Sequence, residues 1–406
     1  MQTVADALRA IPCKAVQKVP DRVIAVLMGG KIGGIYDFLL TCQVVILFQI
    51  QPDVLHIRVG HGGVGASVIA DAYVKGIPMD EKLALEAVVS TSTVPYLEGL
   101  KEYMELGYVP MEKSGSSASV TLEYGYDDWA IYHMAKKMGD REVADTYLKR
   151  AGAYKHLVDE RLGFIRPKNA AGQMKEKFDV LDTHGQGFIE GNSWNYSFYV
   201  PQDVNGLKAF MGGDKRFIER LDSLFTMELP AKYYENTEDI TKEGLMGNYV
   251  HGNEPSQHIP YLYMWTSQPW KTQYRLREIM DRMYRNNIDG LCGNDDCGQM
   301  SAWYIFTAMG FYPVCPGSDQ YVLGAPYLKE MTVHLENGKD LVIKAPKVSA
   351  KNRYVKSVKL NGREYDKAYL THQDICNGGE LFFEMSSTPN KKRVFTEEQK
   401  PYSMTK

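Results

Sequence analysis

The sequence predicts a mainly helical protein that ends in a small antiparallel β domain. Three observations predict it: apolar residues recur at helical spacing from about residue 71 to 228, Gly-Asp turns separate the helices, and short β-rich runs follow Gly310. Hydrophobic residues make up 44% and charged residues 24% of the 406 residues. This composition is typical of an ordinary globular protein, and the length is enough for two or three domains.

The helical prediction rests first on two apolar stripes. Leu122, Tyr126 and Trp129 lie at i, i+4 and i+7. Between the stripes, Gly139-Asp140 supplies a helix stop followed by a start, because Gly tolerates a left-handed cap and Asp accepts bonds from free N–H groups. The second stripe consists of Val143, Tyr147, Ala151, Tyr154 and Val158.

The same signal for the end of one helix and the start of the next recurs further along the chain. Gly212-Gly213-Asp214 precedes a third stripe, and a further helical segment, Gln268 to Tyr284, has Pro269 near its start. The third stripe consists of Phe217, Leu221 and Leu224. Antiparallel helix hairpins joined by tight turns are typical of a bundle, a toroid or a solenoid.

The β domain is predicted from four runs separated by Asn-Gly and Gly-Gly turns. These runs are Thr332–Leu335, Leu341–Ala345, Tyr354–Leu360 and Leu381–Met385. The charged stretch from about Lys391 predicts a flexible tail.

Charge and hydropathy exclude several classes of partner. A formal net charge of -3 gives no electrostatic reason to expect nucleic acid or an anionic membrane. The most apolar run, Thr41 to Ile50, is about half the length that spans a bilayer, and no secretory signal follows Met1. Cys292 and Cys297 are predicted either to bridge or to lie as small buried thiols.

Three polar-aromatic segments at 187–203, 251–258 and 293–303 carry the candidate chemistry. Each places carboxylates and amides in Gly-flanked turns beside aromatic stretches. Each also has a structural interpretation: Glu190 satisfies a turn, Glu254 is a surface acid, and Asp295 and Asp296 cap the helix predicted over Ser301 to Ala308. Three such clusters in one chain favour function, because buried carboxylates are costly unless they bind metal, accept hydrogen bonds or transfer protons.

These residue types suit glycoside hydrolysis. The reaction needs one protonated carboxyl group to assist the leaving oxygen and one ionised carboxylate to activate water or attack the anomeric carbon. Amide, carboxylate and backbone oxygens are also the ligands of a hard cation such as Ca²⁺. The residues alone are therefore compatible with a carbohydrate-active hydrolase.

Five blocks of this sequence resemble the signature blocks of glycoside hydrolase family 92. They are VIADAYVKGI, LEYGYDDWAI, GNSWNYSFYVPQDV, GNEPSQHIPYLY and GNDDCGQMSAWYIFTAMGFYPVCPGS, in this order from about Val68. The resemblance implies an (α/α)₆ toroid, here predicted over residues 66–312 and incomplete if the N-terminal segment adds no helices. A β domain over 313–390 and a flexible tail over 391–406 follow it.

The resemblance also implies an activity and a mechanism. Members of the family are exo-α-mannosidases that invert the anomeric centre. Glu190 then corresponds to the general acid and Asp296 to the general base, with their carboxyl groups about 6.5–9.5 Å apart to admit a water. Calcium contacts mannose hydroxyls in the family and helps to flatten the ring. We place its ligands at Asn253 and Glu254.

The same resemblance also implies the sugar-binding residues, the partners and the location of the protein. Trp194, His258, Asp295 and Gln299 are the candidate sugar-binding residues. The expected partners are mannose-containing oligosaccharides or glycans, with no nucleic acid and no membrane span. The family implies a bacterial protein that is periplasmic, secreted or on the cell surface, and that takes part in N-glycan degradation.

Residues 1–65 depart from the family and form an atypical N-terminal segment. The stretch before VIADAY reads RVGHGGVGAS, and His61 does not align with the histidine that lines the mannose pocket in the family. The alternative to an active mannosidase is therefore an inactive remnant, or a mannose-binding protein with an incomplete pocket.

Overall fold

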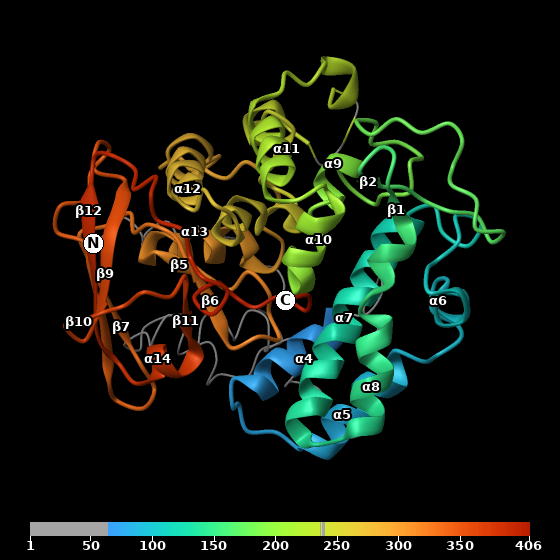
Figure 1. Ribbon diagram of the computed structural model, residues 1–406, viewed down its shortest axis with the longest axis horizontal. Helices are drawn as coiled ribbons and strands as arrows, with labels where there is room; N and C mark the ends of the chain where they lie inside the picture. Colours follow the sequence, from blue (N-terminus) through green and yellow to red (C-terminus); the bar gives the residue numbers. More distant parts are fainter. Residues whose placement is uncertain (1–63, 236, 238–239) are drawn as a thin grey trace.

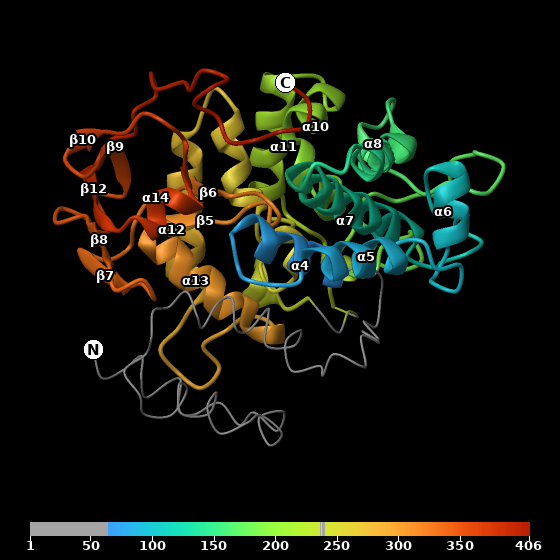
Figure 2. The ribbon, with the colours of Figure 1, turned by 90° about the horizontal axis from the view of Figure 1, so that it is seen from below.

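The computed structural model describes residues 64–235, 237 and 240–406. The N-terminal segment (its last two residues apart) and the apolar run at 41–50 lie outside these residues. Within them, a helical part and a β part lie side by side (Figure 1). The helical part begins with helices gathered around the long helix α7 (Figure 2). These helices are α4 (Val64–Val74), α5 (Glu81–Thr91), α6 (Leu100–Leu106), α7 (Ser117–Met138) and α8 (Arg141–Arg150).

The predicted turn between α7 and α8 is confirmed. Gly139 caps α7 at a φ of 83°, in the left-handed region that favours glycine. The Asp140 carboxylate then accepts a hydrogen bond from the Val143 N–H at 3.1 Å and so starts α8. Leu122 and Trp129 of the first stripe are buried, at 1% and 0% exposure. The local signals at this turn are therefore sufficient to define it.

The helix predicted from the second stripe is confirmed only in its first part. Helix α8 ends at Arg150, Tyr154 lies in the 3₁₀ turn Ala153–Leu157, and Val158 begins the short strand β1 (Val158–Asp159), which pairs with β2 (Phe164–Ile165). The prediction of one continuous helix is wrong because a tertiary contact decides this region. The Tyr154 hydroxyl donates to the buried Asp203 carboxylate at 2.9 Å, which favours the tighter turn.

A second group of helices packs beside the first (Figure 1). It comprises α9 (Ser193–Tyr196), α10 (Val204–Phe210), α11 (Asp214–Thr226), α12 (Trp270–Met283) and α13 (Gln299–Met309). Pro269 is the residue before α12, as predicted. At 212–214, however, Gly213 is the N-cap and the Asp214 carboxylate accepts bonds from the Ser267 N–H and hydroxyl. Asp214 therefore ties α11 to the chain before α12.

The β domain begins directly after the helices and contains a three-stranded sheet in the order β11-β6-β5 and a five-stranded sheet in the order β10-β9-β12-β8-β7. The strands are β5 (Phe311–Tyr312), β6 (Gln320–Leu323), β7 (Glu330–His334), β8 (Asp340–Lys344), β9 (Tyr354–Leu360), β10 (Arg363–Glu364), β11 (Tyr369–Thr371) and β12 (Gly379–Ser386). The prediction of a wholly antiparallel domain is wrong, because β12 pairs with β8 in parallel. The chain between β8 and β12 runs through β9, β10, β11 and helix α14 (His372–Cys376), which is long enough to allow this crossover.

The end of the chain also differs from the flexible tail that the sequence predicts. The Trp129 indole donates to the Tyr402 hydroxyl at 3.2 Å, and the Met404 N–H donates to the Gln202 carbonyl at 3.0 Å. The Asp203 carboxylate accepts from the Thr405 N–H at 2.8 Å. The tail is held because Asp203 is fully buried and needs these donors.

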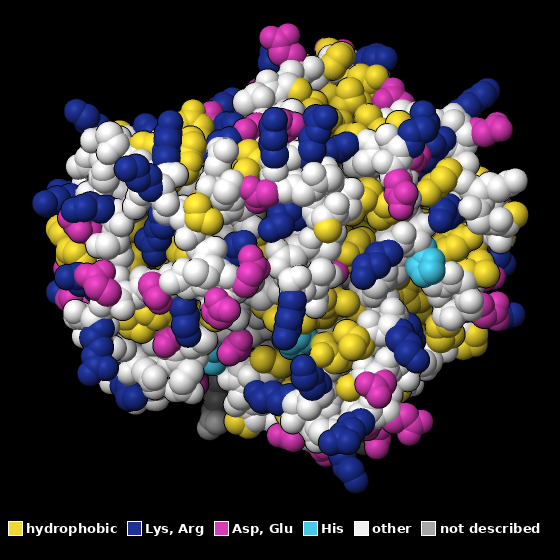
Figure 3. All heavy atoms as spheres, viewed as in Figure 1, with side chains coloured by type: hydrophobic (Ala, Val, Ile, Leu, Met, Phe, Trp, Pro, Cys, Tyr) yellow, Lys and Arg dark blue, Asp and Glu magenta, His cyan; other side chains and the backbone are white. Residues whose placement is uncertain are grey.

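The surface carries no large field of one sign on the face in Figure 3, where basic and acidic side chains are interspersed with apolar ones. This agrees with the small net charge. Among the described residues, no helix is long and apolar enough to cross a membrane.

Candidate active site

The first polar-aromatic segment is fixed by a helix cap. The Asn192 side chain accepts from the Trp194 and Asn195 N–H groups, and the Asn195 side chain accepts from the Asn192 N–H at 3.0 Å. Asn192, Ser193 and Asn195 are all buried. This capping box starts α9 immediately after Glu190 and Gly191, and so defines where the predicted acid lies in the chain.

Asn248 joins this segment to the second one. It lies in the turn between β3 (Leu245–Met246) and β4 (Tyr249–Val250), and it is 1% exposed. Its side chain exchanges two hydrogen bonds with the Asn192 side chain, at 3.1 and 3.2 Å. Its carbonyl accepts from the Asn195 amide at 2.7 Å. The second segment therefore starts directly beside the first.

The second and third segments meet through Gln257, Gln299 and Trp303. The Trp303 indole donates to the Gln257 carbonyl at 3.0 Å, and the side chains of Gln257 and Gln299 are hydrogen-bonded to each other. Gly252 and Gly293 are packed so closely that a Cβ on Gly293 would lie 2.6 Å from the Gly252 Cα. All three segments therefore converge, although they are up to a hundred residues apart.

His251 is the residue at the centre of this convergence, and the sequence analysis gave it no role. Its Nδ1 and Nε2 atoms each lie 2.7 Å from a tyrosine hydroxyl, of Tyr249 and Tyr284 respectively. The Tyr284 hydroxyl donates to the Met300 carbonyl, so it accepts a hydrogen bond from Nε2. Burial lowers the pKa of His251 to about 3. Its ring lies 4.4 Å from that of Trp303.

The two predicted catalytic carboxyl groups lie in different surroundings. Glu190 is partly buried and follows Ile189, whose N–H donates to the Ser119 hydroxyl of α7 at 3.1 Å. Asp296 is exposed at the start of the 3₁₀ turn Asp296–Gly298, and its carboxylate accepts no hydrogen bond from any residue that the structure describes. A carboxylate in that position is accessible to a water molecule.

Asp295 bonds to the start of the helix that follows it, which is the structural role that the sequence analysis gave it. Its backbone is left-handed at a φ of 54°, and its Oδ1 accepts from the Met300 and Ser301 N–H groups at 2.9 and 3.1 Å. Its Oδ2 accepts from the Ser301 hydroxyl at 2.9 Å. Asp295 therefore anchors the first turn of α13 and directs the loop that carries Asp296.

The other predicted sugar contacts also have partners within the protein. The His258 Nε2 lies 2.8 Å from the Phe198 carbonyl, and burial lowers the His258 pKa to about 4. Trp194 is only partly buried and packs edge-on against Phe164, with ring centroids 4.9 Å apart. Gln299 is bonded to Gln257 as described. These contacts fix the side chains and leave their contacts with sugar as predictions.

The residues predicted to bind calcium present suitable oxygen chemistry. Asn253 is 4% exposed, and its amide nitrogen has no hydrogen-bond partner in the part of the chain that the structure describes. Rotating the Asn253 side-chain amide by half a turn exchanges its nitrogen and oxygen, and so places an oxygen at the position without a partner. Glu254 is exposed beside it. The pKa of Tyr312 is raised first by the burial of Tyr312 itself and then by the charge of Glu254. Among the described residues, no three His, Cys, Asp or Glu side chains are grouped so that they could hold a metal ion, so further ligands would be amides, carbonyls or water.

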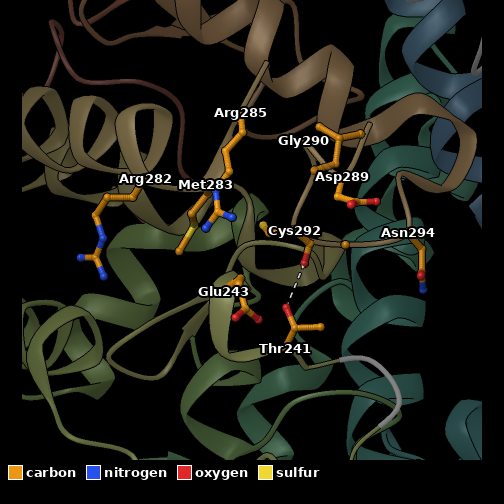
Figure 4. A pocket seen from close by; sticks show the side chains of 11 residues that line it. Thr241, Glu243, Arg282, Met283, Arg285, Asp289, Gly290, Cys292 and Asn294 are labelled. Carbon is orange, nitrogen blue, oxygen red and sulfur yellow. Dashed lines mark hydrogen bonds between the residues drawn. The ribbon is translucent and has the colours of Figure 1, made fainter. Parts of the chain in front are cut away.

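A pocket of about 340 Å³ opens beside the loop that carries Asp296 (Figure 4). Its lining includes Thr241, Glu243, Arg285, Cys292 and Asn294. Cys292 is a free thiol, so it forms no disulfide bridge. The side chain of Cys297, with which a bridge was considered, is not among those that the structure describes. The Arg285 side chain enters the pocket from one wall and the Glu243 side chain lies on the opposite side (Figure 4). Sugar hydroxyls could be hydrogen-bonded by such groups.

The convergence of the three segments agrees with a family comparison. The profile of the glycosyl hydrolase family 92 catalytic domain matches residues 52–387. The chain belongs to this family. The resemblance that the sequence analysis drew from five blocks is therefore confirmed.

Solved members of the family have the same fold. One family 92 α-mannosidase from Bacteroides thetaiotaomicron is 43% identical, with a TM-score of 0.80 over 85% of this chain and 46% of its own. The complex of this enzyme with mannoimidazole gives the same TM-score, 0.80. A family 92 inverting mannosidase from the same organism is 40% identical, with a TM-score of 0.78 over 86% of this chain and 49% of its own.

A curated relative extends the comparison to a eukaryote. An uncharacterised secreted glycosidase of Arthroderma benhamiae is 28% identical over 356 residues, which are 77% of this chain and 43% of that protein. The chain thus spans less than half the length of each of these relatives.

Proposed function

We propose that this chain is an exo-acting α-mannosidase that removes terminal α-linked mannose from oligosaccharides or glycans with inversion. The observation that supports this proposal is the convergence of the three segments. Hydrogen bonds join the parts of the chain that contain Glu190, Asn253 and Asp296 into one region. Family membership supports the reaction class, and the mannoimidazole complex of a relative supports mannose as the sugar. An (α/α)₆ toroid is the architecture that we propose for the helical part.

In the proposed mechanism, Glu190 protonates the glycosidic oxygen while Asp296 removes a proton from a water on the opposite face of the sugar. Single displacement requires the two carboxyl groups to be about 6.5–9.5 Å apart. Asp295 contributes by holding the Asp296 loop against α13, because both of its oxygens accept bonds from the first turn of that helix. The pocket beside this loop is where we propose that the leaving sugar binds.

We also propose that Asn253 and Glu254 hold a calcium ion. When bound, calcium would coordinate mannose hydroxyls and favour the flattened ring of the transition state. The support from this chain is the buried Asn253 amide, one end of which has no partner among the described residues. The fungal relative is named as secreted, and we propose an extracellular or periplasmic location on that basis.

The experiment is to measure mannose release from α-mannobiose with added calcium and then with a chelator. Release that the chelator abolishes supports the enzyme and its metal. If the folded protein binds mannose but releases none, the alternative of a mannose-binding protein with an incomplete pocket is correct. The comparison should include Asn253→Ala, which is expected to raise the calcium concentration needed for half-maximal activity.

A further inference from the structure

The segment that carries Asp296 is a long connection with little regular structure. It joins α12 to α13 and projects away from both helices (Figure 2). Between these helices, its regular structure is limited to a β-bridge at Leu291 and the 3₁₀ turn Asp296–Gly298. The Ile288 side chain is fully exposed. A connection of this kind can hold a catalytic side chain in place only if other contacts fix its two ends.

A single hydroxyl group joins the two ends of this connection. Tyr284 is its first residue, and the Tyr284 hydroxyl donates at 2.9 Å to the carbonyl of Met300, which lies 16 residues later in the first turn of α13. The Met300 N–H donates in turn to the Asp295 carboxylate at 2.9 Å. The backbone of Met300 therefore ties both Tyr284 and the residue before Asp296 to the start of α13.

His251 holds the Tyr284 hydroxyl from a separate part of the chain. Its Nε2 donates to that hydroxyl at 2.7 Å, and its Nδ1 lies 2.7 Å from the Tyr249 hydroxyl of β4. His251 and Tyr249 are both at 0% exposure. Burial, as the largest cause, raises the pKa of Tyr284 well above its usual range, so the hydroxyl keeps the proton that it donates. The closing bond is therefore anchored on a rigid, buried pair of side chains.

The ring of Tyr284 is held independently of its hydroxyl. It is stacked on the ring of Trp303, with centroids 6.0 Å apart and planes at 2° to each other. The Tyr304 ring lies on another side, with its centroid 4.7 Å away. A phenylalanine at position 284 can keep this packing and lose only the hydrogen bonds to His251 and Met300. The contribution of the hydroxyl can therefore be measured separately from that of the ring.

We propose that Tyr284 is a positioning residue that closes the connection 284–300 and so fixes Asp296 in the site, which rests on the proposed role of Asp296 as general base. A general base must lie within hydrogen-bond reach of the water that it activates. Displacing a reacting group by about 1 Å can lower the rate by about 100-fold. Tyr284 acts through Asp296 and not on the sugar, and His251 acts one step further away by holding the hydroxyl.

The test is a double-mutant cycle of Tyr284→Phe and Asp296→Asn, with kcat for α-mannobiose as the readout. Tyr284→Phe is expected to lower the kcat of the parent by about 10–100-fold, because the base is displaced. In Asp296→Asn there is no base to position, so the same substitution is expected to lower kcat by no more than about 2-fold. Tyr304→Phe removes a hydroxyl from the neighbouring ring and leaves the bond to Met300 in place. It is the matched control, with no change in kcat expected.

A second measurement does not depend on turnover. In hydrogen exchange followed by mass spectrometry, the backbone amides of residues 285–299 are expected to exchange faster in Tyr284→Phe than in the parent, with no change in the five-stranded sheet. Unchanged exchange, or an equal loss of kcat with and without Asp296, would overturn the positioning role while leaving the proposed function intact. Asp296→Asn that hydrolyses α-mannobiose like the parent would instead overturn the role of Asp296 as base, and this inference with it.

Discussion

The β domain and the candidate active site are held together in different ways. In the five-stranded sheet, alternate residues of β12 are buried, and Leu381 and Phe383 are at 0% and 1% exposure. In the site, the buried residues include Asn192, Asn248 and His251, and their contacts are hydrogen bonds between distant segments. Apolar burial stabilises the first region, and satisfied polar networks define the second. Substitutions in the two regions should therefore have different consequences.

The largest expected effect is on catalysis. Glu190→Gln and Asp296→Asn should each lower kcat for α-mannobiose by about 10²–10⁴-fold, because a general acid or base contributes that much. The free energy of unfolding of Asp296→Asn should stay close to that of the parent, since Asp296 is exposed and accepts no bond from the described residues. Steady-state kinetics and chemical denaturation measure the two quantities. Full activity in either variant would refute its assigned role.

A substitution in the sheet should show the opposite pattern. Leu381→Ala is expected to lower the free energy of unfolding by about 2–5 kcal/mol, because it leaves a cavity in a core strand. The kcat of the folded fraction should not change. Val394→Ala, at a side chain that is 55% exposed, is the control and should alter stability by less than about 0.5 kcal/mol. A large loss of kcat in folded Leu381→Ala would mean that the two regions are coupled.

Acid should destabilise the protein in part through His251 of the site. The pKa of His251 is about 3 in the folded protein and is lower than in the unfolded chain, so its contribution to stability is present above about pH 6.5 and is lost as the pH falls toward 3. At pH 4.5 this loss is about 2–3 kcal/mol. Denaturation at several pH values measures it, and His251→Gln should flatten the dependence. An equally steep dependence in that variant would exclude His251 as its source.

The smallest expected effect concerns the pocket beside the Asp296 loop. Arg285→Ala is expected to raise KM for α-mannobiose by a factor of about 2–10 with little change in kcat, because one exposed hydrogen bond to a leaving sugar contributes about 0.5–1.5 kcal/mol. Arg216→Ala is a matched control, since Arg216 is exposed, ion-paired with Glu219 at 3.1 Å and not part of the pocket lining. Equal KM values in parent and Arg285→Ala would place the leaving sugar elsewhere.

The same difference between regions explains what the sequence could predict. The strand prediction at Tyr354–Leu360 matches β9, and the helix predicted over Ser301–Ala308 lies within α13. Both depend on short-range periodicity. The parallel pairing of β12 with β8 was missed because a strand pattern does not specify its partner.

The sequence marked the candidate site as three segments but did not predict the hydrogen-bond network that joins them. Gly and polar residues next to aromatics marked 187–203, 251–258 and 293–303 in the sequence. No local signal pairs Asn192 with Asn248 or places His251 between two tyrosines, because these contacts join positions far apart in the chain or depend on side-chain orientation. The tail was missed for the same reason: its charged composition suggests flexibility, yet the buried Asp203 requires its donors.

The most direct test of the account is the stereochemistry of the first product. Proton NMR of the reaction with α-mannobiose distinguishes the anomers of mannose before they equilibrate. Action of Glu190 and Asp296 on one bond through a single displacement predicts that β-mannose appears first. Initial release of α-mannose would contradict the account, because it requires a double displacement with a different pairing of carboxyl groups.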